Sequence, residues 1–406
     1  MPPTCPGMPV TSDSPNIEAP GAAARAVTIV AHDIGPVGGM ERQLSALIRG
    51  LLERGWEVTT IARRCELPPH PLLRRIRVVG PRRPFVLAYP WFFALGSIAV
   101  SRHRRGLLHT TGAIVLNHAD VSTVHYCHHA ARTRGDARRA GSRSLLKRVN
   151  ATVAVWMKLL GETLVYDARR TRFIVCSSAG VADELRATLA VGLDRLAVIP
   201  NGVDTAAFEP DAALRASARR RFGIGERDFV ALFLESDWER KGLRFAIEGV
   251  AMVPECRLLV VGRGDTARYR ALAEGAGAAD RVLFVGTTKE LASCYSAADA
   301  FVLPTEYDSA PLALYEAAAS GLPLVVTRMN GAEGVVEDGV SGWFVERDAH
   351  DIAARLETVQ GNPVLGRELG GAARCAAARY TWESIVDQYC DLYIRCSSER
   401  SGKAGG

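Results

Sequence analysis

Several features that would fix a function class early are missing from this sequence. Its nine cysteines form no C-x-x-C pair, and their spacing fits no zinc or disulfide framework. There is no G-x-G-x-x-G turn, which argues against a Rossmann oxidoreductase. There is also no Asp-x-Asp pair placed to hold a divalent ion, so we expect neither a metal nor another cofactor. Several cysteines lie in apolar runs such as FIVCSS, which favours a reducing cytoplasm.

Charge and hydropathy exclude further classes. The net charge of +6 is a small and dispersed excess, so we expect no nucleic-acid partner. Residues 1–24 lack the basic-then-apolar layout of a signal peptide and are expected to be a disordered leader. One apolar stretch, residues 84–101, is shorter than a membrane span of about 20 residues and contains Pro90 and Gly96. It predicts a buried helix, and the alternative is a segment that dips into a membrane.

The pattern that is present alternates strands and helices. AVTIVAHDIG predicts a buried parallel strand, the glycine loop PVGGM follows, and ERQLSALIRGLLERG and WEVTTIAR predict a helix and the next strand. Further strands are predicted at GAIVLNHA, STVHYCHH and RFIVCSS, with a long helix over residues 144–166. The second half repeats the alternation from FVALFLES to GWFVE. The sequence therefore predicts two α/β domains in tandem.

The predicted boundaries follow from this alternation. Residues 25–205 form the N-terminal domain and residues 206–378 the C-terminal domain. Residues 379–397 form a C-terminal helix that crosses back to the first domain, and residues 398–406 a disordered tail.

A basic pair in the second half suits a diphosphate. Arg240 and Lys241, in ERKGL, are predicted to open a helix, where cations oppose the helix dipole. An anion between these charges and the free backbone N–H groups would compensate that cost. The alternative is a solvated Arg-Lys pair.

Two acids follow in DSAPLALYEAAASGLP. Glu316 is predicted to lie on a helix and Asp308 in the loop before it, after the strand DAFVLP. A carboxylate accepts hydrogen bonds from two neighbouring hydroxyls, which suits a ribose diol or the edge of a hexose. The carboxyl end of a parallel strand is where open α/β sheets bind ligands. The alternative is a pair of surface charges. Backbone N–H groups at the start of this helix are predicted to bind phosphate or sugar oxygens, from Ser309, Ala310, Pro311 and Leu312.

Taken in order, these segments resemble glycosyltransferase family 4. The resemblance rests on RVLFVG, YSAADAFVLPTEYDSAPLALYEAAASGLPLVVT and GVVEDGVSGWFV, with PNGVD at residues 200–204 and GGME at residues 38–41. It implies an α/β GT-B architecture of two Rossmann-like doubly wound domains facing a cleft. It also implies a retaining enzyme of the kind used in polysaccharide biosynthesis. Such an enzyme moves a hexose from a UDP- or GDP-linked nucleotide sugar to a glycan, lipid-linked or small-molecule acceptor.

The resemblance also assigns roles in the second half. Glu316 matches the acid that holds the donor ribose, and Asp308 matches the acid that touches the donor sugar, although a shorter Asp stands here. Lys241, with Arg240, matches the pair that neutralises the donor diphosphate. Many relatives place an arginine six residues before the lysine, where this chain has Glu235.

The remaining carried-over residues lie in the first half. Gly38 and Gly39 match a loop that faces the phosphates and the acceptor. His128 matches a catalytic histidine at a strand end, with His125 and His129 as alternatives. Strand alternation would put His125 and His128 on opposite faces. Two rival functions share the fold or the ligand: a phosphorylase or sugar-nucleotide synthase, and a non-catalytic protein that binds nucleotide sugars.

A basic run precedes the long predicted helix. The helix carries Trp156 and several leucines, and basic residues beside an apolar helix face are typical of a membrane-interfacial segment. We therefore expect a cytoplasmic protein held peripherally on an anionic membrane through residues 132–166. The alternative is a solvated arginine face over a core-packed helix. The run comprises Arg132, Arg134, Arg138, Arg139, Arg143, Lys147 and Arg148.

Overall fold

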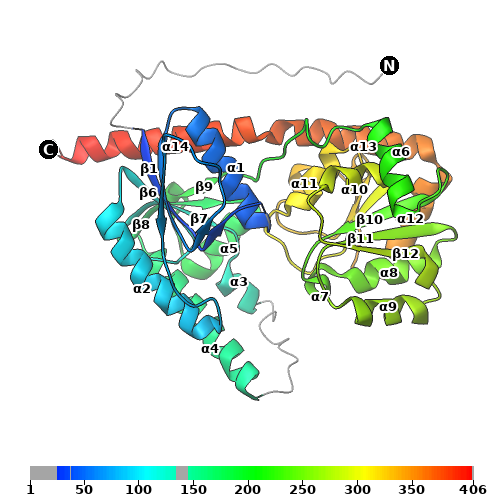
Figure 1. Cartoon of the computed structure of the whole chain (residues 1–406), viewed down its shortest axis with the longest axis horizontal. Coiled ribbons are helices and arrows are strands. Elements are labelled where there is room, and N and C mark those ends of the chain that lie inside the picture. Colours follow the sequence, from blue (N-terminus) through cyan, green and yellow to red (C-terminus); the bar gives the residue numbers. More distant parts are fainter. Residues whose placement is uncertain (1–24, 37, 134–144, 405–406) are drawn as a thin grey trace. The chain divides into compact units, whose positions relative to one another are not determined.

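A computed structural model describes residues 25–36, 38–133 and 145–404 of the chain (Figure 1). It divides into two compact units. The N-terminal unit holds the described residues up to Asn201 together with those from Trp382 onwards, and the C-terminal unit is Gly202–Thr381. The boundaries expected from the sequence, after residues 205 and 378, lie a few residues from these.

The described part of the N-terminal unit is built on a seven-stranded sheet in the order β5-β3-β1-β6-β7-β8-β9, all parallel. Its strands are β1 (Ala26–Val30), β3 (Glu57–Ala62), β5 (Leu73–Arg77), β6 (Leu107–Thr111), β7 (Ala119–Val124), β8 (Thr171–Cys176) and β9 (Leu196–Val198), beside the short pair β2 (Asp33–Ile34) and β4 (Arg64–Cys65). The strand predicted at GAIVLNHA is wrong, because β6 ends at Thr111. Ile114 and Val115 are apolar and buried, but they lie in a loop rather than in a strand.

The helices of this unit are α1 (Gly39–Glu53), α2 (Phe85–His103), α3 (His128–Thr133), α4 (Leu145–Val165), α5 (Ala179–Leu189) and α14 (Trp382–Ala404). The C-terminal helix α14 packs on α1. A Cβ at Gly50 of α1 would press into the side chain of Val386, so this glycine permits the close approach.

The predicted disordered tail is wrong over residues 398–404, where α14 continues to Ala404. Contacts with β8 hold the added turns: the Arg172 guanidinium donates to the carbonyl of Cys396 at 3.0 Å and pairs with the carboxylate of Glu399.

The helix predicted over residues 84–101 is confirmed as α2, but the expectation that it is buried is wrong for one of its sides. Ala88, Phe92 and Val100 of α2 are buried, but Leu87 and Trp91 are exposed. The sequence could not separate these faces because both are apolar. Among the described residues, α2 is the one helix long and apolar enough to cross a membrane by length and composition.

The described residues of the C-terminal unit form a parallel six-stranded sheet in the order β12-β11-β10-β13-β14-β15. Its strands are β10 (Phe229–Leu234), β11 (Cys256–Val261), β12 (Val282–Gly286), β13 (Ala300–Leu303), β14 (Leu324–Val326) and β15 (Gly342–Phe344). Its helices are α6 (Ala212–Phe222), α7 (Trp238–Lys241), α8 (Leu243–Met252), α9 (Thr266–Gly275), α10 (Leu291–Ala297), α11 (Leu312–Ala319), α12 (Ala349–Gly361) and α13 (Pro363–Ala377).

Strands β10 and β13 are neighbours at the centre of this sheet. Because they are parallel, the chain leaves both at the same edge. Glu235 follows β10 there, and the loop that carries Asp308 follows β13. This is the edge at which open α/β sheets bind ligands.

Candidate active site

The sequence predicted that the basic pair opens a helix, but in the structure the pair closes a short one. Arg240 and Lys241 are the last residues of α7, and Gly242 separates α7 from α8 with φ of 81°. A Cβ at Gly242 would collide with the carbonyl of Pro304, directly after β13. The glycine therefore lets the end of α7 rest against the loop that carries Asp308.

Lys241 lies between two carboxylates. Its ammonium donates to Glu235 Oε1 at 2.6 Å and to Asp308 Oδ2, and its side chain is only 6% exposed. Burial on its own lowers the pKa of Lys241, but the attraction of Glu235 and Asp308 outweighs it and raises the pKa above its usual value. Lys241 is therefore a fixed positive charge at the edge of the sheet.

The ion pair with Lys241 explains where the side chain of Glu235 points. Its carboxylate faces the ammonium rather than solvent, and its side chain is 18% exposed. Burial is the largest influence on the pKa of Glu235 and raises it, against the lowering effect of Lys241. The cluster of Glu235, Lys241 and Asp308 thus sets two acids against one cation.

Arg240 is held beside this cluster by other groups. Its Nε pairs with Asp237 Oδ2 at 2.8 Å, and its Nη1 donates to the carbonyl of Tyr307 at 2.6 Å. The side chain is about one-third exposed, at 34%. Arg240 therefore spans from α7 to the residue before Asp308.

Arg347, after β15, is a positioning residue that sequence reasoning missed. Its guanidinium donates to the carbonyls of Glu239 at 2.8 Å, of Arg240 at 3.1 Å and of Pro304 at 3.1 Å. It also pairs with Glu306 at 3.1 Å. Arg347 thereby joins the end of α7 to the loop after β13. No sequence signal marks it, because most of its acceptors are backbone carbonyls.

Glu316 lies on α11, as predicted, and is buried. Its Oε2 accepts a hydrogen bond of 2.8 Å from the Tyr295 hydroxyl, which also reaches the carbonyl of Ala313 at 3.2 Å. Tyr295, from α10, is a second residue that the sequence did not single out. Its bond fixes the orientation of the Glu316 carboxylate.

The loop from Ser309 to Leu312 differs from its prediction. The N–H of Ser309 donates to Asp308 Oδ1 at 2.9 Å, and Pro311 carries no N–H. Helix α11 begins at Leu312 with Pro311 as its N-cap and no side-chain cap. Ala310 packs against Gly331. The N–H donors at this helix start therefore come from fewer residues than the four that were predicted.

In the N-terminal unit, the strand predicted through His128 ends at Val124, and His128 begins α3. The cause is a residue distant in sequence. The buried carboxylate of Glu162, from α4, accepts the N–H groups of His128 at 2.8 Å and His129 at 3.2 Å and so starts the helix. The expectation that His125 and His128 lie on opposite faces of one strand therefore does not hold.

The three candidate histidines have different surroundings. The His128 ring lies 4.7 Å from that of Tyr126, and burial, followed by Lys158 and His129, lowers the pKa of His128 to about 3. The Nε2 of His129 contacts the carbonyl of Leu159 and the hydroxyl of Thr163.

His125 directly follows β7, and burial lowers its pKa to about 4. Within the described residues its Nε2 has no hydrogen-bond partner. His125 therefore stays an alternative to His128, and both imidazoles are neutral at pH 7.

Gly38 and Gly39 start helix α1. Gly38 is its N-cap, with φ of 95°, and a Cβ there would collide with the carboxylate of Glu41. Gly39 has open space beside it. Gly38 therefore adopts a backbone conformation that would be strained for a residue with a side chain.

Comparisons with known proteins identify the family of the chain. A family model described as Glycosyltransferase Family 4 matches residues 37–207, and one described as Glycosyl transferases group 1 matches residues 215–374. A D-inositol 3-phosphate glycosyltransferase of Xylanimonas cellulosilytica is 28% identical, over 91% of this chain and 94% of that enzyme.

Solved structures share the fold. WaaG, a glycosyltransferase involved in lipopolysaccharide biosynthesis, superimposes with a TM-score of 0.77 at 19% identity, over 90% of this chain and 99% of that one. HepE of Anabaena, solved with UDP and glucose, gives a TM-score of 0.69 at 16% identity, over 90% and 98% of the two chains. The predicted GT-B fold of two Rossmann-like domains is confirmed. The chain belongs to glycosyltransferase family 4 and is a glycosyltransferase.

Proposed function

We propose that the chain is a retaining hexosyltransferase that uses a UDP- or GDP-linked sugar and needs no metal ion. The observation that carries this proposal is the buried Lys241, held at the carboxyl edge of β10 and β13 beside Asp308 and Arg240. A preorganised cation at this edge suits a diphosphate leaving group, whose negative charge grows as the bond to the sugar breaks.

The other residues take complementary roles in this proposal. Glu316, oriented by Tyr295, accepts the ribose hydroxyls, and Asp308 accepts hydroxyls of the donor sugar. When the donor binds, the diphosphate replaces part of the contact that Lys241 makes with Glu235 and Asp308. His128, or His125 in its place, orients the sugar as a neutral imidazole.

Two findings support the substrate classes. HepE, which shares the fold, has been solved with UDP and glucose, and the relative from Xylanimonas is named for D-inositol 3-phosphate. We propose a glycan, lipid-linked or small-molecule acceptor, with an inositol phosphate as the first to try. The free cysteines of the described residues support a cytoplasmic location.

The test is release of UDP or GDP from a panel of nucleotide sugars in the presence of these acceptors, with the anomer of the product assigned by NMR. The proposal expects release that depends on the acceptor and a product that keeps the donor's anomeric configuration. Inversion would refute the retaining mechanism. A requirement for inorganic phosphate would favour a phosphorylase, and binding without release would favour the non-catalytic alternative.

A further inference from the structure

Helix α2 has two apolar faces, of which one is packed in the unit and the other meets solvent. Its buried residues recur every fourth position and join the core of the N-terminal unit: Ala88, Phe92, Gly96 and Val100. Its exposed residues also follow helical spacing, with Leu87 exposed by 60%, Trp91 by 51% and Ile98 by 45%. A helix that only completed a core would carry polar residues on this outer face.

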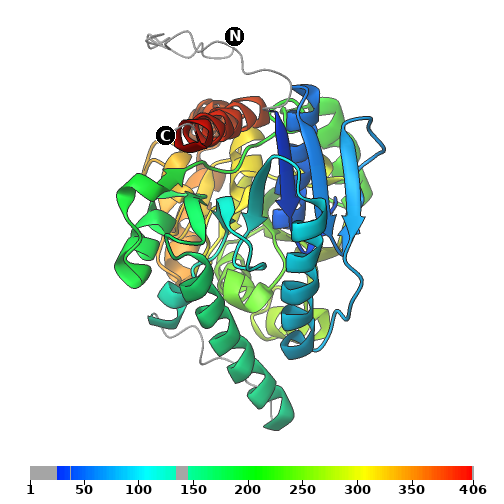
Figure 2. The same cartoon turned by 90° about the vertical axis from the view of Figure 1, so that its left-hand side faces the viewer.

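Helix α4 repeats the arrangement and packs beside α2, as both views show (Figures 1 and 2). The ammonium of Lys158 on α4 lies 5.0 Å from the ring centroid of Phe85 on α2 and links the two helices. The exposed apolar residues of α4 are again spaced by three or four positions: Val153, Trp156, Leu160 and Leu164.

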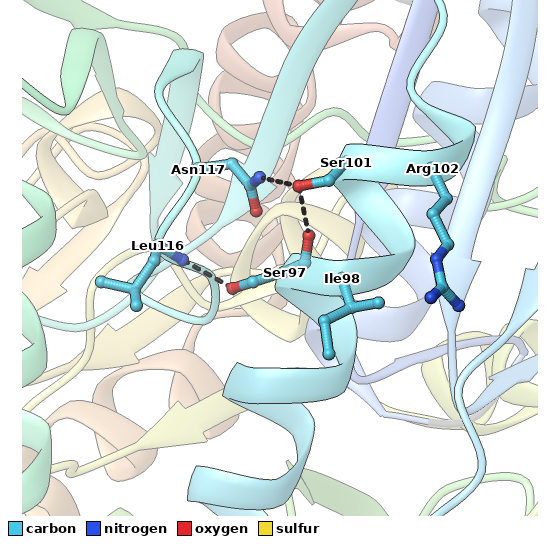
Figure 3. Close-up of a pocket in the computed structure, with 6 residues that line it drawn as sticks. All are labelled: Ser97, Ile98, Ser101, Arg102, Leu116 and Asn117. Atoms are coloured by element: carbon cyan, nitrogen blue, oxygen red, sulfur yellow. Dashed lines mark hydrogen bonds between the residues drawn. The ribbon is translucent and has the colours of Figure 1, made fainter.

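The loop before β7 completes this surface. Leu116, which is exposed, donates its backbone N–H to the Ser97 hydroxyl of α2 at 2.9 Å, and Asn117 donates to the Ser101 hydroxyl at 3.0 Å (Figure 3). These bonds fix Leu116 beside Ile98. We name the resulting surface the α2–α4 face: Leu87, Trp91, Ile98, Leu116, Val153, Trp156, Leu160 and Leu164. It holds more than half of the large apolar side chains that the described residues expose.

The surroundings of the α2–α4 face are basic. No Asp or Glu lies between Glu66 and Asp120, whereas that interval contains eight arginines. The guanidinium of Arg132 lies 4.7 Å from the ring centroid of Trp156. The described arginines that are exposed at the ends of α2 and α4 are Arg82, Arg83, Arg102, Arg105, Arg169 and Arg170.

We propose that the α2–α4 face docks on an anionic phospholipid bilayer, with α2 and α4 lying in the headgroup region. An apolar stripe edged by arginines fits this partner, because the stripe enters the acyl boundary while the guanidinium groups meet lipid phosphates. The inner stripe of α2 is already packed in the N-terminal unit, so α2 lies along the membrane rather than spanning it.

This inference extends the expectation for residues 132–166 and does not depend on the transfer reaction. It adds α2, which the sequence placed in the core. Of the basic run from Arg132 to Arg148, the described side chains include only that of Arg132.

A second copy of this chain fits the face less well than a membrane. Two identical faces that pair about a twofold axis would bring their arginine borders together, and like charges repel. An anionic bilayer supplies the opposite charge.

The test is sedimentation of the protein with vesicles of phosphatidylcholine, with or without phosphatidylglycerol, at low salt. Wild type should bind the anionic vesicles and release them at high salt. The variant Leu87→Gln/Trp156→Gln/Leu160→Gln, at exposed positions, should bind at least about tenfold more weakly, since it removes three apolar anchors. A control variant changes two apolar residues that are comparably exposed elsewhere, Leu193→Gln/Val364→Gln, and should bind like wild type.

The charges are tested in the same way. Arg102→Gln/Arg105→Gln should weaken anionic binding by roughly thirtyfold, since each of the two basic groups near such a surface contributes on the order of 1 kcal/mol. The control Arg220→Gln/Arg227→Gln, in the C-terminal unit, should not.

Depth is read from quenching of tryptophan fluorescence by brominated lipids. Quenching should occur in wild type and fall in Trp156→Phe. The proposal is overturned if wild type does not bind anionic vesicles, or if the triple variant, with wild-type circular dichroism, binds equally well. It is also overturned if the triple variant instead dissociates a dimer in sedimentation velocity.

Discussion

Replacing Glu235 by glutamine should tighten the binding of a nucleoside diphosphate. The ammonium of Lys241 is shared between Glu235 at 2.6 Å and Asp308, so an incoming diphosphate competes with two carboxylates for one cation. Glutamine keeps the shape and a hydrogen-bond acceptor but removes one negative charge. Lys241 stays paired with Asp308, so we expect the site to remain folded.

The magnitude follows from Coulomb's law. Two unit charges about 6 Å apart interact by about 3 kcal/mol at an effective dielectric constant of about 20. Because the Glu235 side chain is 18% exposed, solvent screens part of this, and we expect a gain of about 1–2 kcal/mol, or roughly tenfold in affinity. Isothermal titration calorimetry with UDP and GDP measures it. Equal or weaker binding by Glu235→Gln would refute the competition between Glu235 and the diphosphate.

The same pair predicts a pH dependence. Burial raises the pKa of Glu235, and a bound diphosphate would raise it further, so binding takes up a proton. Affinity in wild type should therefore fall as pH rises through the pKa of Glu235. The Glu235→Gln variant should lose this component and keep only the titration of the nucleotide itself. Identical pH profiles in the two proteins would contradict this.

Four further outcomes are expected. Lys241→Ala should reduce turnover by about 10²-fold or more, since one electrostatic contact at such a site is worth about 3 kcal/mol; normal turnover in a folded variant would end its assignment. Glu316→Gln should cost a similar factor in the same assay, and near-wild-type activity would remove it from the site. Activity should survive EDTA, and loss on chelation with rescue by Mg²⁺ would show that a metal takes part. Gly50→Ala should lower the free energy of unfolding by about 1–3 kcal/mol in a urea titration, because its Cβ presses on Val386; an unchanged midpoint would contradict the close packing of α1 and α14.

Local signals predicted most of the scaffold. Short apolar runs, glycine turns and amphipathic helices repeat along both halves, and each is decided by neighbours in sequence. Glu316 on a helix, with Asp308 in the preceding loop, followed from the same patterns. The long helix predicted over residues 144–166 is confirmed as α4.

Contacts between distant residues decided what the sequence could not predict. His128 starts a helix because Glu162, 34 residues away, accepts its N–H. Glu235 was visible as a departure from the family pattern, but its ion pair with Lys241 depends on how α7 follows β10. The sequence did not reveal the exposed side of α2, because an apolar pattern reads the same whether a helix face packs in a core or lies at the surface.

The most direct test of the central claim is a crystal structure of the protein with UDP or GDP bound. The account predicts that the diphosphate contacts Lys241 and Arg240 beside the start of α11. It also predicts that Glu316 accepts the ribose hydroxyls and that Glu235 no longer holds the ammonium by itself. A nucleotide bound elsewhere, with Lys241 still paired to both Glu235 and Asp308, would contradict it.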